Sequence, residues 1–423
     1  MALEKFIISG GSSLSGRLRV KGAKNSILPI LAASLLTSER VELKDVPDIS
    51  DVKVMLNILE CLGVKVSREK DILLLEPGSL YTSEIPESLM CEMRSSIFLM
   101  GPLLGRLGKV KVSYPGGCDI GPRPIDLHLK GLISMGVNIK EENGCVQAEA
   151  RSLKGSNVHL DFPSVGATEN IMMAAIYARG TTTIHNAAKE PEIIDLQNFL
   201  NKMGAKIKGA GTDTIKIEGV KSLGKVSYTL IPDRILAGTM IIAAAITRGE
   251  LMLENVIPEH LEAVSSKLRE AGVEIWEEGD VLHVKGRKIN AVQSVRTLPY
   301  PGFPTDMQAQ TMTLLTLARG TSVITENVFD GRFSHVGELK KMGADIMVDG
   351  RSAVIQGVKQ LHGAVVKAPD LRAGAALVLA GLAAEGHTIV EEIHHIDRGY
   401  EKFEETLRGL GANIKRVGIP AEV

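Results

Sequence analysis

A short motif that returns six times constrains the fold of this chain more than any other feature of its sequence. The motif reads Leu-x-x-x-Gly-(Ala/Val)-x-(Ile/Val), and successive copies are 68 to 73 residues apart. A glycine that ends a helical pattern and precedes a β-branched run is typical of a helix C-terminus leading into a strand. The sequence therefore predicts six copies of one structural unit. The six glycines are Gly63, Gly136, Gly204, Gly272, Gly343 and Gly411.

Each unit is expected to contain a second, more apolar helix upstream of the motif. Because these helices are apolar on nearly every face, we expect them to be buried on all sides. A turn such as Arg179-Gly180 or Glu385-Gly386 often follows and introduces a short strand. The predicted helix starts lie near Ala23, Met93, Thr168, Arg234, Asp306 and Leu371.

Units of this length are too long for a simple solenoid, so two lobes of three units each fit the chain better. The predicted fold class is therefore α/β. One lobe is expected to comprise residues 22–231 and the other residues 1–21 together with 232–423. Residues 1–21 precede the first full unit, and we expect them to complete the second lobe.

The composition excludes several classes of protein. The chain has 423 residues and is 44% hydrophobic, which predicts a sizeable core. Its 49 Lys and Arg nearly balance its 50 Asp and Glu, which argues against a general binder of nucleic acid or anionic membranes. No apolar run approaches the length of a membrane span, and the N-terminus lacks the pattern of a signal peptide.

The four cysteines follow neither a disulfide-dense pattern nor CxxC spacing. We therefore expect reduced thiols and a cytoplasmic location. Cys61 and Cys91 lie in helical patterns and Cys145 lies at a strand edge, so ordinary packing is expected for these three.

Cys118 is different, because it lies in a loop rich in glycine and proline, Tyr114–Asp126. A strand is predicted over Val110–Tyr114 and a helix over Leu127–Met135, with Pro124 suited to the first turn of the helix. Glycines let such a loop approach a ligand closely, and Arg123 lies where helix N–H groups favour anions. Two interpretations remain open. The loop is either a mobile catalytic loop that carries a proton donor or nucleophile, or a surface turn with an incidental cysteine.

Cations recur at predicted helix starts, where the helix dipole disfavours them. This arrangement is reasonable if anions bind there, in a cleft between the lobes. Alternatively, the side chains curl back to local carboxylates such as Asp233, Asp370 and Asp397. The cations are Lys24, Arg94, Arg234 and Arg372, with Arg398 at the start of a further helix.

Acidic residues also occupy helix starts, as at Asp306, Asp370 and Asp233. Each could simply cap its helix. A carboxylate in this position also stays ionised, as a general base requires, although a lowered pKa weakens the base.

No metal or nucleotide motif is present. His335 and the pair His394-His395 lack the spacing of metal ligands, and we expect them to be packing or surface residues. The sequence has no GxxxxGK[ST] loop and no convincing GxGxxG after a strand. We expect no metal and no cofactor.

Five segments together resemble the UDP-N-acetylglucosamine 1-carboxyvinyltransferases, which belong to the enolpyruvyl transferase family. The resemblance covers essentially the whole chain. It implies a two-lobed, inside-out α/β barrel of six βαβαββ units, three per lobe, with the active site in the interlobe cleft. The segments are Gly22–Asn25, Gly116–Asp126, Ser164–Thr168, Phe303–Gln310 and His395–Tyr400.

The implied reaction is the first committed step of bacterial peptidoglycan synthesis, in the cytoplasm. The enolpyruvyl group of phosphoenolpyruvate moves to the 3-hydroxyl of UDP-N-acetylglucosamine, and phosphate leaves, by addition and then elimination. The implied partners are these two small molecules, without nucleic acid or membrane, and the implied state is a monomer.

The resemblance also implies roles for individual residues. Cys118 is the expected general acid toward the enol carbon and forms a covalent adduct with phosphoenolpyruvate, and Asp306 is expected to deprotonate the sugar hydroxyl. Lys24, Arg123 and Arg398 are expected to surround phosphoenolpyruvate, with Asn25 beside Lys24. The expected contacts with the nucleotide sugar are Arg94, Arg123, Pro124, Ile125, Asp126, Leu127, Ser164, Val165, Gly166, Asp306 and Val328, with Arg332, Asp370 and Arg372 in support.

One segment departs from the family pattern. Phe162-Pro163 stands where some members carry a lysine near the pyrophosphate. Backbone N–H groups of Ser164–Gly166 are expected to make that contact instead.

Two other functions compete with this reading. The sister enzyme transfers the same group to shikimate 3-phosphate, but it lacks the Gly-Gly-Cys-x-Ile-Gly loop. A non-catalytic relative would only sense the nucleotide sugar. The joint presence of Cys118, Lys24, Asp306 and Arg398 argues against the second alternative.

Overall fold

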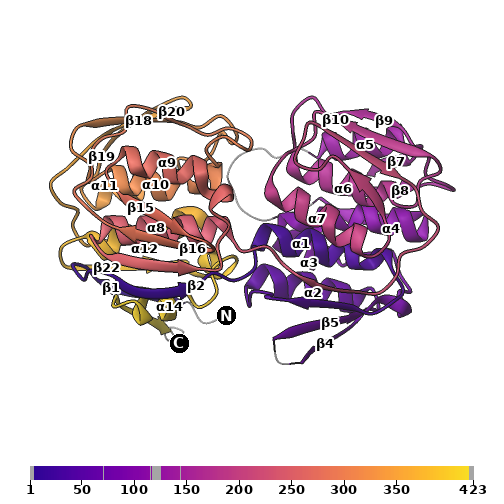
Figure 1. Cartoon of the computed structure of the whole chain (residues 1–423), viewed down its shortest axis with the longest axis horizontal. Coiled ribbons are helices and arrows are strands. Elements are labelled where there is room, and N and C mark those ends of the chain that lie inside the picture. The colour runs from indigo at the N-terminus through magenta and orange to yellow at the C-terminus, as the bar shows by residue number, and fades with distance from the viewer. Residues whose placement is uncertain (1–3, 70, 115, 117–124, 143, 419–423) are drawn as a thin grey trace. The chain divides into compact units, whose positions relative to one another are not determined.

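The structure is a computed structural model, and it describes residues 4–69, 71–114, 116, 125–142 and 144–418. The described residues form two compact units (Figure 1). One unit lies between Gly22 and Ile231, and the other combines the segment up to Lys21 with the chain from Pro232 onward.

The Gly22–Ile231 unit contains helices and strands in alternation. Its elements are α1 (Lys24–Ala33), η1 (Ser34–Leu36), β3 (Val41–Lys44), α2 (Ser50–Cys61), β4 (Lys65–Glu69), β5 (Ile72–Glu76), η2 (Pro77–Ser79), α3 (Glu87–Glu92), η3 (Arg94–Leu99), α4 (Met100–Leu107), β6 (Lys109–Ser113), α5 (Asp126–Ser134), β7 (Asn138–Glu142), β8 (Cys145–Glu149), β9 (Asn157–His159), α6 (Val165–Ala175), β10 (Thr181–His185), α7 (Pro191–Lys202), β11 (Lys206–Lys208), β12 (Thr214–Glu218) and β13 (Val226–Thr229).

The other unit begins with two N-terminal strands. Its elements are β1 (Glu4–Ser9), β2 (Ser15–Arg19), α8 (Arg234–Ile246), β14 (Glu250–Glu254), η4 (Pro258–Leu261), α9 (Glu262–Glu270), β15 (Glu274–Glu278), β16 (Val281–Lys285), β17 (Val295–Arg296), η5 (Thr305–Met307), α10 (Gln308–Leu315), β18 (Thr321–Thr325), α11 (Val336–Lys341), β19 (Asp345–Asp349), β20 (Ser352–Gln356), β21 (Val365–Lys367), α12 (Leu371–Ala383), β22 (His387–Glu391), α13 (His394–Asp397), α14 (Phe403–Gly409) and β23 (Asn413–Gly418).

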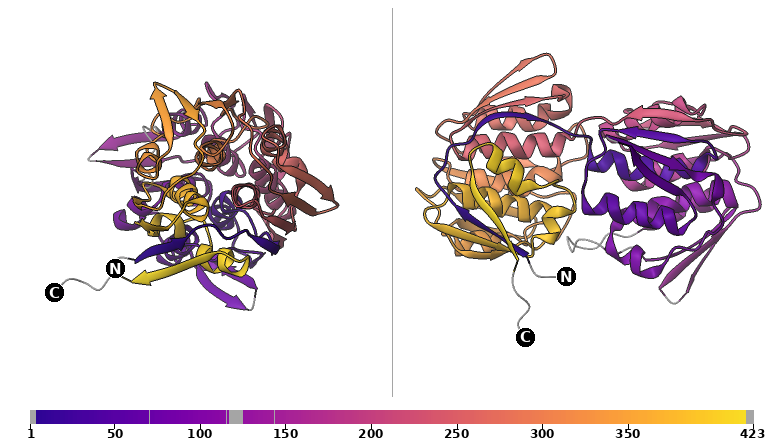
Figure 2. Two further views of the ribbon diagram at one scale, coloured as in Figure 1. Left: turned by 90° about the vertical axis from the view of Figure 1, so that its left-hand side faces the viewer. Right: turned by 90° about the horizontal axis from the view of Figure 1, so that it is seen from below.

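The predicted α/β fold with repeated units is confirmed. The described strands form six small, separate sheets rather than one continuous barrel. Within each unit the most buried helices lie inside and the sheets lie outside (Figure 2). The sheet orders are β13-β3-β5-β4, β6-β8-β7 and β11-β12-β10-β9 in one unit, and β15-β16-β14-β2, β17-β18-β20-β19 and β21-β22-β1-β23 in the other.

Every four-stranded sheet has the same pattern. One edge strand runs parallel to its neighbour, as β13 does to β3, and the remaining pairs are antiparallel. The three-stranded sheet lacks a regular parallel edge strand, but an isolated bridge between Glu84 and Lys111 takes its place. The sheets are therefore six copies of one arrangement.

The six motif glycines end helices as predicted. Each adopts a positive φ, between +89° and +109°, just after a helix and just before a strand. This left-handed conformation costs glycine little, whereas a side chain would strain it. The strands that follow the glycines are β4, β7, β11, β15, β19 and β23.

The apolar helices are buried as predicted, because a helix that is apolar all round has no face to offer to water. Twelve of the thirteen residues of α12 are buried, as are eleven of thirteen in α8 and all eight in α10. In the other unit, α1 and α6 occupy the same position in their repeats. No described helix has the length and apolarity needed to cross a lipid bilayer.

The chain does not complete its repeats in strict order. Strand β2 pairs with β14, far along the chain, whereas β13 returns to pair with β3. Strand β1 fills the last sheet by pairing with both β22 and β23. Where the chain enters and leaves the Gly22–Ile231 unit, the N–H of Ala23 donates to the carbonyl of Ile231 at 2.8 Å.

The expectation of ordinary packing for the cysteines was wrong at two positions. Cys61 lies in α2 and Cys91 in α3, as the helical patterns predicted, but both are exposed, and Cys145 is half-buried at the start of β8. Both helices cover the core with one face only, and these residues lie on the other face.

Candidate functional site

In the Gly22–Ile231 unit, the first turn of α1 presents Lys24 and Asn25. Lys24 is only 9% exposed, and its Nζ lies 2.8 Å from Oδ2 of Asp51 on α2. No side chain caps α1 at Ala23. The start of this helix is therefore held by backbone hydrogen bonds and by the interactions of other side chains. A cation held at the positive end of a helix is a suitable partner for a ligand anion.

Other predicted residues of this unit also lie at helix starts. Arg94 is the first residue of η3, and Ile125 precedes the first turn of α5, which contains Asp126 and Leu127. Both segments belong to the repeat that ends at Gly136, so one repeat supplies two helix N-termini that carry predicted site residues.

The segment Ser164–Gly166 forms the N-terminus of α6. The Ser164 hydroxyl accepts a hydrogen bond from the N–H of Ala167 at 3.3 Å. A side chain at Gly166 would approach the His128 ring to 3.1 Å, so glycine permits the close packing here. Just before it, Phe162 is 44% exposed, and Lys130 forms an ion pair with Asp161 at 2.6 Å.

In the other unit, Asp306 lies between two arginines. Arg332 donates to its Oδ1 at 2.8 Å and Arg372 donates to its Oδ2 at 2.9 Å. Both arginine side chains are buried, whereas the Asp306 side chain is 24% exposed. Burial alone would raise the pKa of Asp306, but the charges of Arg372 and Arg332 outweigh it and hold this pKa well below its usual range.

A buried hydrogen-bond chain supports Arg372 from behind. Its Nη1 donates to the Tyr400 hydroxyl at 3.3 Å, and that hydroxyl lies 3.0 Å from the hydroxyl of Thr239. Gln310 donates to the oxygens of Thr239 and Tyr400 at 3.2 and 3.3 Å. The three buried helices α8, α10 and α12 thus converge on the arginine that holds Asp306.

Val328 is brought into the neighbourhood of Asp306 by Glu326, a residue that is 1% exposed. The Glu326 carboxylate accepts from the N–H of Val328 at 2.8 Å and from the hydroxyl of Thr305, next to Asp306, at 2.9 Å. Two loops that carry predicted sugar contacts are therefore fixed by one carboxylate.

Asp370 caps α12, because its Oδ1 accepts from the N–H groups of Arg372 and Ala373 at 2.8 and 3.1 Å. Asp233 caps α8 in the same way. The expectation that such aspartates occupy helix starts is confirmed. Both bind backbone N–H groups at the starts of their helices, and Asp233 also interacts electrostatically with Arg372.

The position expected for Arg398 was wrong. It follows the last residue of α13 instead of starting a helix. A cation at a helix C-terminus is favoured by the dipole, so its presence needs no anion. The neighbouring Asp397 is held by Arg416 through two hydrogen bonds of 2.6 and 2.9 Å.

Cys118, Arg123 and Pro124 lie outside the described residues, so their predicted roles rest on the sequence alone. Asp51 and Glu326 were missed by sequence reasoning. The only signal for Asp51 was an acidic residue in a first helical turn, which equally indicates a cap.

No group of three or more potential metal ligands occurs among the described residues. His335 is fully buried, and neither ring nitrogen has a hydrogen-bond partner. Burial lowers the pKa of His335 to about 4, although Asp370 acts in the opposite direction.

This histidine predicts a pH dependence of stability. Below its unfolded pKa of about 6.5, the unfolded chain binds a proton that the folded protein excludes. The free energy of unfolding should therefore fall by on the order of 2 to 3 kcal/mol between pH 7 and 4 through this residue alone. Urea titrations can follow the fluorescence of Trp276, the only tryptophan and a residue of the same unit. His335→Gln should flatten the decline, and an equally steep decline in that variant would contradict the assignment.

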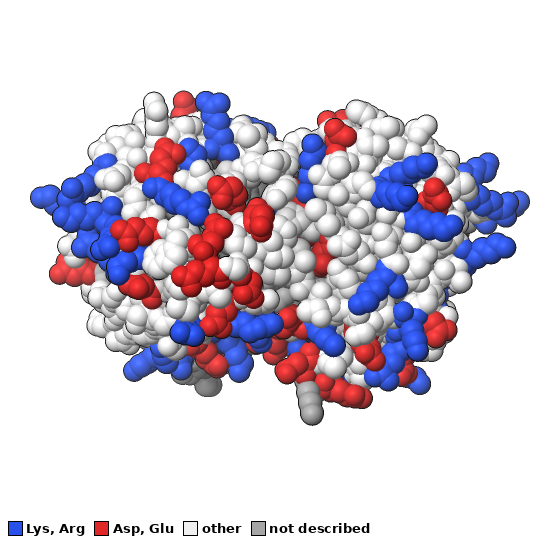
Figure 3. Space-filling model, in the orientation of Figure 1, with Lys and Arg blue, Asp and Glu red and all other residues white. Residues whose placement is uncertain are grey.

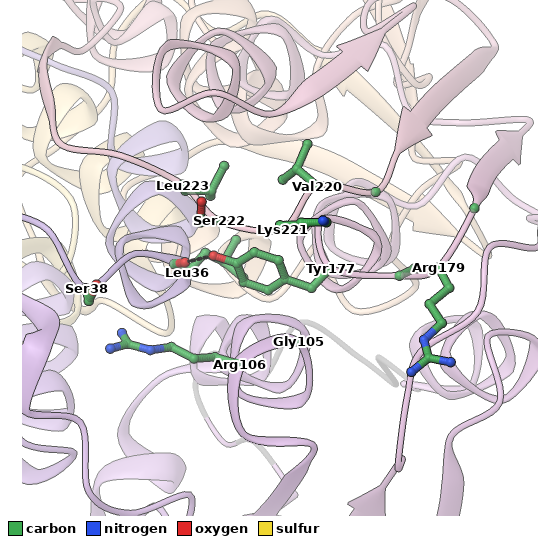
Figure 4. Close-up of a pocket in the computed structure, with 13 residues that line it drawn as sticks. Leu36, Ser38, Gly105, Arg106, Tyr177, Arg179, Val220, Lys221, Ser222 and Leu223 are labelled. Carbon is green, nitrogen blue, oxygen red and sulfur yellow. Dashed lines mark hydrogen bonds between the residues drawn. The ribbon is translucent and has the colours of Figure 1, made fainter.

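A surface pocket of about 660 Å³ opens in the Gly22–Ile231 unit, but it contains none of the predicted site residues (Figure 4). The Arg106 guanidinium on its wall donates to three backbone carbonyl groups at 2.7 to 2.9 Å. In Figure 4, the guanidinium groups of Arg106 and Arg179 lie at opposite ends of the pocket, so they do not converge on one anion. Positive and negative side chains are mixed on the face drawn in Figure 3, in keeping with the formal charge of −1.

Residues 8–407 match the family model described as EPSP synthase (3-phosphoshikimate 1-carboxyvinyltransferase). The chain is 57% identical to UDP-N-acetylglucosamine 1-carboxyvinyltransferase 1 of Caldanaerobacter subterraneus subsp. tengcongensis, over 97% of this chain and 99% of that protein. It is 56% identical to UDP-N-acetylglucosamine 1-carboxyvinyltransferase 2 of Carboxydothermus hydrogenoformans, over 98% and 100%.

Solved structures give the same fold. The enolpyruvyl transferase NikO from Streptomyces tendae superimposes with a TM-score of 0.90 at 27% identity, over 99% of this chain and all of that one. EPSP synthase from Acinetobacter baumannii has a TM-score of 0.76 at 19% identity, over 98% of this chain, which supports the fold alone.

Proposed function

Because the chain belongs to the UDP-N-acetylglucosamine 1-carboxyvinyltransferases of the enolpyruvyl transferase family, we propose that it performs their reaction. It transfers the enolpyruvyl group of phosphoenolpyruvate to the 3-hydroxyl of UDP-N-acetylglucosamine and releases inorganic phosphate. The protein is thus a transferase of peptidoglycan synthesis. The observation that carries this conclusion is the identity of 57% over nearly the full length of both chains.

The reaction consists of two steps with a tetrahedral intermediate. In the addition, the sugar oxygen bonds to C2 of phosphoenolpyruvate, the hydroxyl loses its proton, and C3 gains one. In the elimination, C3 loses a proton, the C2–O bond to phosphate breaks, and the double bond returns. The first step needs a base for the hydroxyl, an acid for C3 and cations for the phosphate and carboxylate groups.

Asp306 is the proposed base, and its surroundings impose a condition on this role. A carboxylate that is clamped by two guanidinium groups accepts a proton poorly, because its pKa is far below neutrality. We therefore propose that nucleotide-sugar binding draws at least one arginine away from Asp306. Arg332 and Arg372 then donate hydrogen bonds to the anionic groups of the substrates, while Asp306 becomes an active base.

Lys24 is a proposed donor to phosphoenolpyruvate, with Asn25, Arg123 and Arg398. The Lys24 ammonium is paired with the Asp51 carboxylate, and a phosphate group of the substrate can replace that carboxylate as its partner. Cys118 is the proposed acid toward C3. That both units contribute to one active site, in the predicted interlobe cleft, is likewise a proposal that rests on the family resemblance.

Phosphate release tests the function directly. The purified protein should release phosphate from phosphoenolpyruvate when UDP-N-acetylglucosamine is present. It should not do so with shikimate 3-phosphate or without an acceptor. Release with shikimate 3-phosphate would instead establish the sister activity, and no release with either acceptor would favour a non-catalytic sensor. Sedimentation of the same sample tests the proposed monomer.

A further inference from the structure

We propose that Asp195 is a positioning residue, which fixes the first turn of α1 through the hydroxyl of Ser26 and thereby places Lys24 for phosphoenolpyruvate. This inference rests on the proposed function, in which Lys24 binds that substrate. Asp195 belongs to none of the segments that suggested the active site.

Asp195 lies on α7 and is 1% exposed, yet its carboxylate has three hydrogen-bond donors. The Ser26 hydroxyl makes a short hydrogen bond to Oδ2. The Tyr228 hydroxyl donates to Oδ1 at 2.6 Å, and the N–H of Ile231 reaches Oδ2 at 3.5 Å. Together these donors connect α1, β13 and the end of the unit to one buried group.

The chemistry of the carboxylate suits this task. An ionised carboxylate only accepts hydrogen bonds, so three converging donors leave it no alternative arrangement. Burial raises the pKa of Asp195, while the hydrogen bonds from Ser26 and Tyr228 act in the opposite direction. The pKa of Asp195 is raised overall, so the donors offset only part of the cost of removing the carboxylate from water.

The connection to Lys24 is short. Ser26 is fully buried two residues after Lys24, in the same helical turn, and α1 packs against α7 (Figure 1). The N–H of Ala23 also donates to the carbonyl of Ile231, the residue whose own N–H reaches Asp195. The first turn of α1 is thus held on both sides of Lys24, at Ala23 and at Ser26.

This turn needs such support because no side chain caps α1. The ion pair between Lys24 and Asp51 cannot hold the turn during the reaction if the ammonium exchanges its partner for phosphate. The hydrogen bond between Ser26 and Asp195 does not involve the ammonium, so it persists when substrate binds. Small displacements of a donor group are costly in catalysis, which makes the position of this turn important.

The chain offers a matched pair of variants, because Ser26→Ala and Tyr228→Phe each remove one hydroxyl that donates to Asp195. Only Ser26 lies on α1. Ser26→Ala should raise KM for phosphoenolpyruvate roughly threefold to tenfold, as expected for one hydrogen bond. KM for UDP-N-acetylglucosamine should change far less. Tyr228→Phe should leave both KM values unchanged. Its melting temperature should fall at least as much as that of Ser26→Ala.

Asp195→Asn provides a third measurement, because the amide keeps the volume but turns an N–H donor toward another donor. It should reproduce the selective loss of phosphoenolpyruvate affinity. Equal kinetic losses in Ser26→Ala and Tyr228→Phe, or no change in KM in Ser26→Ala, would overturn the proposal and leave Asp195 as a core hydrogen-bond group.

Lys24→Ala separates this inference from the function on which it rests. If Lys24→Ala leaves KM for phosphoenolpyruvate unchanged, the role of Lys24 is wrong and the positioning role falls with it. If Lys24→Ala impairs phosphoenolpyruvate binding and Ser26→Ala does not, only the positioning role is overturned.

Discussion

Replacing Asp306 by asparagine should lower turnover by about 10²- to 10⁴-fold, the usual cost of removing a general base. The amide has the shape of the carboxylate, and its oxygen can still accept from one of the two arginines. It cannot take up the proton of the sugar hydroxyl. Single-turnover phosphate release with both substrates measures the loss, and calorimetry with UDP-N-acetylglucosamine shows whether the variant still binds.

The same variant should lose about 1 to 3 kcal/mol of stability, since the amide N–H₂ group faces an arginine that was paired with an acceptor. Arg332→Lys is a suitable comparison, because it weakens the clamp while leaving the carboxylate in place. We expect Arg332→Lys to retain far more turnover than Asp306→Asn. Turnover near that of the native protein in Asp306→Asn would show that Asp306 serves only as a structural partner of the two arginines.

Cys118→Ala should lose most net turnover, whereas Cys118→Asp should keep a measurable rate. A carboxylic acid can donate a proton to an enol carbon, but a methyl group cannot. A carboxylate opens an epoxide poorly, so Cys118→Asp should also resist phosphonate epoxides such as fosfomycin. Steady-state phosphate release with and without the epoxide measures both effects.

The other cysteines make the site of modification a strict test. Cys61 and Cys91 are exposed, so accessibility alone would place an epoxide adduct on them. An anionic phosphonate should instead react where Arg123 and helix N-termini attract it and favour the thiolate. Mass spectrometry should locate the adduct on Cys118, and Cys61→Ser with Cys91→Ser should remain sensitive. An adduct on either exposed thiol, or full activity in Cys118→Ala, would refute this reading of the loop.

The repeat could be predicted because its signals are local. A glycine such as Gly204, after an amphipathic helix and before a β-branched run, fixes a left-handed residue whatever surrounds it. The same holds for the apolar helix at Arg234–Ile246, whose burial follows from having no polar face. The family motifs added the candidate site residues, and the structure brings Asp306, Arg332 and Arg372 together.

What the sequence did not reveal depends on partners that are distant along the chain. Asp51 and Asp195 look like ordinary helical carboxylates until Lys24 and Ser26 are placed against them. Arg398 was assigned to the wrong end of a helix because a single turn has no periodicity to show its direction. Cys61 and Cys91 were misjudged because a helical pattern gives burial only when the orientation of its apolar face is known.

The pairing of β1 with β22 and β23 has a consequence for synthesis on the ribosome. Residues of the first two strands emerge early, but their partners in β14, β22 and β23 are translated only after the whole Gly22–Ile231 unit. That unit draws all its strands from one continuous stretch, so it can fold during translation, as domains generally do. Strand β2 must wait until β14 has been made, and β1 until β22 and β23 have been made, so the nascent chain exposes their unpaired edges to chaperones and misassembly in the meantime.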